Sequence, residues 1–271
     1  MTELPLHTAI VLWLILFSTL ACFFVCLLGW LRQRCSSALP PVPQFPGTRA
    51  QIGFSYAYTA FFVLTFSMAA AASARMPEQT QVSPVEMVIS MVVQIALYVP
   101  LLIVYFMLSR GSRKAQIPFL RKVLWMVLGL GVVLSTGVLL EITGFIRWLV
   151  QVTGCPEQQD VVQSLISGSN FEKILMAFMA VIVAPITEEC CFRGFVYNIL
   201  KRWSTPVVGA VFSALLFSVV HASLAQTVPL FVFGLVQCVL YEKSRSLMLP
   251  VMLHMLFNAI NVTGIFLFMQ P

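Results

Sequence analysis

Two adjacent glutamates and one arginine interrupt a stretch of the chain that is otherwise apolar. The sequence there reads EECCFR, with charges at Glu188, Glu189 and Arg193, and residues 174–183 just before it carry no charge. Ionisable side chains inside such a segment are rare because their burial in lipid is costly, and they typically mark a functional site. These three residues are therefore the first candidates for chemistry.

The spacing of these charges predicts different roles for the two glutamates. Glu189 and Arg193 lie four residues apart with the acid first, the favourable order for an ion pair on a helix. We expect Arg193 to neutralise and orient Glu189 through its forked guanidinium. Glu188 lies about 100° away around the same helix, so it is expected to point elsewhere and stay available. Pro185, which lacks an N–H, predicts a kink or a free backbone carbonyl nearby.

Two further polar pairs with helical spacing lie on later apolar segments. Phe217 and His221 are four residues apart, as are His254 and Asn258, so each pair shares one helix face. Each polar group alone has an ordinary structural explanation, such as an ion pair that locks the fold or an interhelical hydrogen bond. Together, a carboxylate, two imidazoles and an amide are the parts that activate a water and stabilise an oxyanion.

The composition shows what must position these groups. The chain has 271 residues, of which 59% are apolar and 10% charged, whereas soluble domains are about 25% charged. Its mean hydropathy is +0.93. We therefore predict an all-α integral membrane protein, a polytopic transmembrane bundle of about eight helices with the active site in a cavity among the later helices. The composition leaves no room for a separate soluble domain.

The predicted helices follow from the apolar segments, since lipid admits only helices or closed barrels. These segments are 8–31, 52–74, 85–108, 123–146, 173–200, 206–222, 226–241 and 247–269. Residues 1–50 are predicted to form an N-terminal transmembrane helix and a proline-rich linker, and residues 51–271 the core. The last three segments are short or closely joined, so one of them could be re-entrant.

The charge distribution predicts an orientation. Of the 16 Lys and Arg residues, 12 fall on alternate loops, and such a bias marks the cytoplasmic side. The net charge of +6 is thereby explained without nucleic acid. His221 would then lie at the outer end of its segment unless that helix is kinked or re-entrant. The seven cysteines predict no disulfide framework, because most lie in apolar runs and no two pairs share metal-ligand spacing.

The three polar clusters resemble the motifs of the CPBP intramembrane proteases, which include CAAX prenyl endopeptidases of the Rce1 type and bacterial Abi proteins. The Glu-Glu-x-x-x-Arg motif is EECCFR, the Phe-x-x-x-His motif is FSVVH, and the His-x-x-x-Asn motif is HMLFN. They occur in the family's order within residues 173–262. Each motif alone is weak, but three in order are specific.

The resemblance implies an intramembrane endopeptidase that hydrolyses a peptide bond near the membrane surface. Glu188 would activate the attacking water, and His221 would help to hold it. His254 and Asn258 would supply the oxyanion hole, while Glu189 and Arg193 would orient the site. The substrate would be a peptide or protein, with or without a lipid, from CAAX-type or bacterial peptide processing. The expected location is a bacterial plasma membrane, or the endoplasmic reticulum of a eukaryote.

Three alternatives remain open from the sequence. A single zinc could bind Glu188, His221 and His254, although we favour no metal because the chain has no His-Glu-x-x-His helix. The chain could instead be a non-catalytic membrane protein that binds a partner or confers bacteriocin immunity on the same fold. It could also be a transporter with a buried Glu-Arg-His relay, although no repeated half is visible. Membrane lipid is the other expected partner, and the sequence predicts no oligomeric state.

Overall fold

The computed structural model describes residues 117–155 and 160–269, together with the isolated residues 9, 10, 13, 14, 17, 88, 92, 96, 99, 102 and 103. Within these ranges every regular element is a helix and there is no strand, which confirms the predicted all-α class. The expected segments 8–31, 52–74 and 85–108 lie outside the described ranges apart from those isolated residues. The same holds for the predicted boundary at residue 50.

The five later apolar segments all form helices. The elements are α4 (Phe119–Ile142), α5 (Phe145–Thr153), α6 (Asp160–Ser167), α7 (Asn170–Phe178), η1 (Met179–Val183), α8 (Ala184–Glu189), η2 (Cys190–Tyr197), α9 (Asn198–Trp203), α10 (Pro206–Val220), α11 (Thr227–Ser244) and α12 (Met248–Phe268), where η marks a π-helical segment. Elements α7 to α9 run on as one helix of 34 residues. This helix, α4 and α12 are each long and apolar enough to cross a membrane, as expected of an integral membrane protein.

Local sequence signals explain where several helices begin and end. Ser169 and Glu172 form a capping box at the start of α7, in which the Ser169 hydroxyl accepts from the Glu172 N–H and the Glu172 carboxylate accepts from the Ser169 N–H. Pro206 opens α10 behind a Thr205 cap. Gly144 and Gly154 take positive φ values at the two ends of α5, a conformation that glycine adopts readily.

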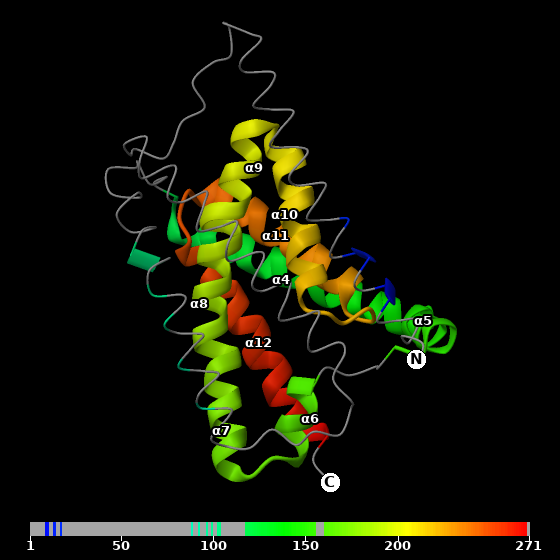
Figure 1. Cartoon of the computed structure of the whole chain (residues 1–271). Coiled ribbons are helices and arrows are strands. Elements are labelled where there is room, and N and C mark those ends of the chain that lie inside the picture. The colour runs from blue at the N-terminus through cyan, green and yellow to red at the C-terminus, as the bar shows by residue number, and fades with distance from the viewer. Residues whose placement is uncertain are drawn as a thin grey trace, which may run out of the picture.

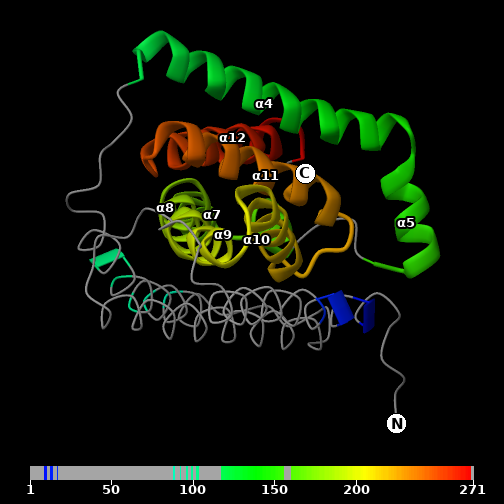
Figure 2. The same cartoon turned by 90° about the horizontal axis from the view of Figure 1, so that it is seen from above.

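The helices pack in three layers. Seen from above, α11 and α12 lie between α4 on one side and the elements α7 to α10 on the other (Figure 2). The long helix and α12 run beside each other down the molecule (Figure 1). Much of the core between the layers is aromatic, with Phe192 from η2, Phe217 from α10 and Phe233 from α11 buried in one cluster. The cluster also contains Cys190 and Cys191, both fully buried, which here act as small apolar side chains.

The short α10 brings His221 to the middle of the long helix. Fifteen residues make a helix about 22 Å long, which is less than the roughly 30 Å of a bilayer core. His221 caps the C-terminal end of α10, and its Nε2 lies 3.8 Å from Glu188 Oε2. Glu188 is 18 residues from Asn170, where the long helix begins. The end of α10 therefore lies beside the middle of the long helix, and the expectation of a kinked or re-entrant helix stays a prediction.

Two ion pairs in the described residues differ in burial. The predicted Arg193–Glu189 pair is present, with 3.0 Å between Nη1 and Oε1, and both side chains are 0% exposed. Arg193 Nη2 also donates to the Gly234 carbonyl of α11, and the guanidinium stacks 4.5 Å from the Phe217 ring centroid. The Arg147–Glu141 pair has the same length, but its side chains are 67% and 57% exposed.

We predict that Arg193→Leu destabilises the protein by about 3–5 kcal/mol, because it leaves the buried Glu189 charge without its partner. The matched control is Arg147→Leu, which breaks the exposed pair and should cost less than about 1 kcal/mol. The free energy of unfolding of the detergent-solubilised protein measures both. Equal losses in the two variants would contradict the prediction.

Gly234 marks the closest approach of α10 and α11. A Cβ at this position would lie 2.9 Å from both the Cα and the Cβ of Ala214. Gly234→Ala should therefore force the helices apart and lower stability by about 1–3 kcal/mol. Gly131→Ala in α4 is the control, because its Cβ meets nothing within 4 Å and alanine favours a helix by up to about 1 kcal/mol. A thermal midpoint for Gly234→Ala at or above that of the wild type would refute the close approach.

Candidate active site

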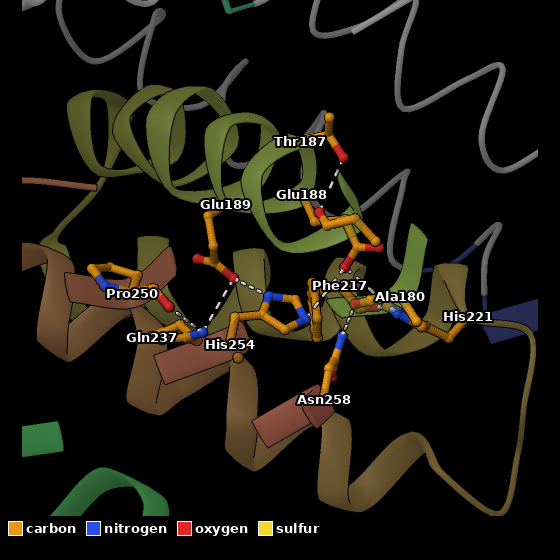
Figure 3. A network of polar contacts seen from close by, with 12 residues as sticks. Ala180, Thr187, Glu188, Glu189, Phe217, His221, Gln237, Pro250, His254 and Asn258 are labelled. Carbon is orange, nitrogen blue, oxygen red and sulfur yellow. Dashed lines mark hydrogen bonds and ion pairs between the residues drawn. The ribbon is translucent and has the colours of Figure 1, made fainter. Parts of the chain in front are cut away.

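The Glu189 carboxylate is the centre of the polar network among the helices. Its Oε1 accepts from Arg193 Nη1 at 3.0 Å, from His254 Nδ1 at 2.9 Å and from Gln237 Nε2 at 3.3 Å. Figure 3 shows the last two contacts converging on the carboxylate from α11 and α12. Three donors therefore meet on one carboxylate oxygen, and the one from Arg193 is a charge-assisted hydrogen bond. The role expected of Arg193 is therefore shared among three residues.

Both histidines have their Nδ1 atom engaged. His221 Nδ1 lies 2.7 Å from the Phe217 carbonyl of its own helix, and His254 Nδ1 lies 2.9 Å from Glu189 Oε1. Because a carbonyl and a carboxylate can only accept, each Nδ1 carries the proton. The spacing of Phe217 and His221 is explained by this hydrogen bond. In the neutral imidazoles, each Nε2 is then an acceptor.

Glu188 faces both of these Nε2 atoms. Its Oε2 lies 3.8 Å from His221 Nε2 and 3.9 Å from His254 Nε2, and it makes no hydrogen bond to any residue in the described ranges. Figure 3 shows Glu188 pointing away from Glu189 towards the two imidazoles. Three hydrogen-bond acceptors therefore converge. The separations between Glu188 Oε2 and the two Nε2 atoms are too long for a direct hydrogen bond and suit a bridging water better. The two glutamates therefore contact different partners, as their spacing predicted: Glu189 pairs with Arg193 and Glu188 points elsewhere.

Asn258 replaces a backbone donor that Pro185 lacks. In the π-helical turn of η1, Ala184 N–H donates to the carbonyl five residues earlier, Met179 O. The next bond of this kind would run from residue 185 to Ala180 O, and proline has no N–H. Asn258 Nδ2 donates to Ala180 O at 2.7 Å instead. The sequence predicted a freed carbonyl, and its partner is one of the expected oxyanion-hole residues. An amide has two N–H groups, so one remains for another acceptor.

The zinc alternative is tested by the geometry of its three expected ligands. The chemistry of the donors suits zinc, because metal-bound histidines commonly donate their other N–H to a carboxylate or carbonyl. However, two ligands at about 2.0–2.1 Å from one tetrahedral zinc lie about 3.4 Å apart, less than the 3.8 and 3.9 Å observed. No group of three His, Cys, Asp or Glu side chains in the described residues is arranged to hold a metal. Glu188 therefore lies farther from both imidazoles than two ligands of one zinc lie from each other, and the preference for a metal-free site stays a prediction.

Gln237 is the polar residue of this network that the motifs do not include. It is fully buried in α11 and donates both to Glu189 and to the Pro250 carbonyl, at 3.1 Å. The sequence feature that could have identified Gln237 is its position as a polar residue within the apolar segment 226–241. A search for ionisable residues passes over an amide, although amides in membrane helices also need partners.

One comparison with known proteins, the match to a family model, covers the part of the chain that carries the motifs. Residues 170–260 match the family described as "Type II CAAX prenyl endopeptidase Rce1-like". The "Uncharacterized 24.3 kDa protein" of Escherichia coli is 33% identical over 98 residues, which are 34% of this chain and 45% of that protein. "Putative membrane peptidase YdiL" of Bacillus subtilis (strain 168) is 27% identical over 88 residues, 32% of this chain and 36% of that protein. No solved structure matches.

The matches span less than half the length of both curated relatives. The family match at residues 170–260 includes all three motifs, from Glu188 in α8 to Asn258 in α12. The three long apolar helices suggest an integral membrane protein, and residues 170–260 are similar to a family described as prenyl endopeptidases. The resemblance seen in the motifs is therefore confirmed over residues 170–260, a segment that is similar to the Rce1-like family.

Proposed function

We propose that the chain is an intramembrane endopeptidase in which Glu188 activates the attacking water. The observation that carries the proposal is the convergence of Glu188 Oε2 with the Nε2 atoms of His221 and His254. A water among them would donate to Glu188 and to one imidazole, which leaves an oxygen lone pair for attack. The fixed Nδ1 atoms support this role, because they keep both Nε2 atoms turned towards the same place.

The proposed step balances its protons and charges. Glu188 takes a proton from the water as its oxygen attacks the peptide carbonyl, and the same proton passes to the leaving amine when the C–N bond breaks. The oxyanion accepts from Asn258, through its second amide N–H, and from His254 Nε2. His254 donates from Nε2 only when both its nitrogens are protonated, because Nδ1 already donates to Glu189. The charges of Glu188, Glu189, Arg193 and His254 then sum to zero.

The substrate we propose is a peptide or protein segment held at the membrane, with or without a lipid. The family description points to prenylated CAAX proteins, whereas both relatives are bacterial, which favours bacterial peptide processing. The proposed setting is accordingly a multi-pass protein of a bacterial plasma membrane, oriented with its basic loops inside.

We predict that Glu188→Ala removes peptide cleavage, a loss of about a hundredfold or more, because the general base is gone. The control is Glu141→Ala, which removes an exposed carboxylate of α4 and should keep the wild-type rate. Proteomics of cleaved peptides in cells expressing wild type or Glu188→Ala would identify the substrate and measure the loss. Retained cleavage in folded Glu188→Ala protein would contradict the assignment of Glu188 as the general base. If the wild type itself cleaves nothing, a non-catalytic partner-binding role replaces it.

Metal dependence separates the glutamate reaction from the zinc alternative. We predict that dialysis against a strong chelator leaves the cleavage rate of the purified protein unchanged, because Glu188 lies farther from both imidazoles than two ligands of one zinc lie from each other. The control is a zinc peptidase treated in the same way. Loss of activity that returns with added Zn²⁺ would establish the alternative.

A further inference from the structure

Gln237 lies in the middle of α11, and the mechanism proposed above does not use it. Its side chain is 0% exposed and sits between the helices that carry Glu189 and His254 (Figure 3). Burying a primary amide is costly unless its N–H groups find partners. The position of those partners indicates what the residue does.

The amide bonds two acceptors on two other helices. Its Nε2 donates to Glu189 Oε1 of α8 at 3.3 Å and to the Pro250 carbonyl of α12 at 3.1 Å. A carboxylate and a carbonyl can only accept, so the amide must turn its NH2 group towards both. Each N–H has one acceptor, and Gln237 thereby joins α8 to α12.

Both contacts act on His254. Glu189 Oε1, which accepts from Gln237, also accepts from His254 Nδ1 at 2.9 Å. Pro250 lies four residues before His254, about one helical turn, so the bond to its carbonyl holds the turn that carries the histidine. Gln237 therefore fixes the imidazole through its carboxylate partner and through its backbone.

We propose that Gln237 is a positioning residue that sets the orientation and tautomer of His254 and so keeps its Nε2 facing Glu188. The expected effect on cleavage rests on the proposed function, whereas the effect on the imidazole does not. The amide is suited to this place because it donates without charge. A glutamate would add a third carboxylate beside Glu188 and Glu189, and a methionine would keep the length but donate nothing.

Kinetics of the purified full chain provide the first test. We expect Gln237→Met to lower kcat about tenfold or more, as is typical when a group that orients a site residue is removed. KM should stay within about twofold, because substrate contacts are unchanged. The control is Ser213→Ala, which removes another fully buried donor whose hydroxyl binds the Phe192 carbonyl. A wild-type kcat in Gln237→Met, or an equal loss in Ser213→Ala, overturns the proposal.

Nitrogen NMR of the histidines gives a readout that needs no substrate. The chain has three histidines, so ¹⁵N-histidine labelling and a His254→Asn reference identify the His254 signals. We expect a protonated Nδ1 in the wild type and a shift towards mixed tautomers in Gln237→Met. Unchanged His254 signals overturn the proposal, whereas a shift in a protein without peptidase activity refutes only the proposed function. If Gln237→Met does not fold, Gln237→Glu is measured instead, and loss of folding in both also overturns the proposal.

Discussion

A single buried carboxylate oxygen, Glu189 Oε1, organises the described part of the molecule. It accepts donors from its own helix, from α11 and from α12, through Arg193, Gln237 and His254. An ion buried among apolar helices is tolerated only when such partners satisfy it. The three helices must therefore keep the relative positions that bring these donors to one point. The aromatic core built around Phe217, which also stacks on the Arg193 guanidinium, closes around the same centre. The same contacts to Glu189 therefore fix both the packing of the helices and the positions of the polar groups.

The same constraint explains why two neighbouring glutamates differ. The donors hold Glu189 on one side of the helix, and the turn of the helix directs Glu188 to the other, where it meets two imidazoles and no fixed donor. The π-helical segments lie on either side of this pair, at Met179–Val183 and Cys190–Tyr197. Such segments are frequent at functional sites because their wider turns leave carbonyls for other partners. Here Asn258 takes the Ala180 carbonyl, while Asn198 donates to the Arg193 and Gly194 carbonyls.

Local spacing in the sequence predicted what lies within one helix and could not predict what joins different helices. The Glu189–Arg193 pair follows from a four-residue spacing, and so does the freed carbonyl near Pro185. The partners of these groups come from residues 48 to 78 positions away, which no periodicity reveals. The roles predicted for His221 and Asn258 were therefore incomplete, because each side chain also forms a hydrogen bond to a backbone carbonyl. The apolar segment 206–222 was recognised as a helix, but its end beside Glu188 depends on α10 packing against η2 and α11. Gln237 was missed because its importance lies wholly in contacts between helices.

In the proposed reaction, His254 links the buried carboxylate of Glu189 to the chemistry. With both imidazoles neutral, three acceptors face one another around Glu188 Oε2, an arrangement that requires protons or a cation between them. A zinc would satisfy the three directly, but at shorter separations than those observed. In the proposed reaction a water supplies two protons, and His254 supplies a third when it donates from Nε2. Glu189 lies beside that imidazole, because its Oε1 is 2.9 Å from Nδ1. The carboxylate that holds the helices together would then also be the group that allows His254 to stabilise an oxyanion.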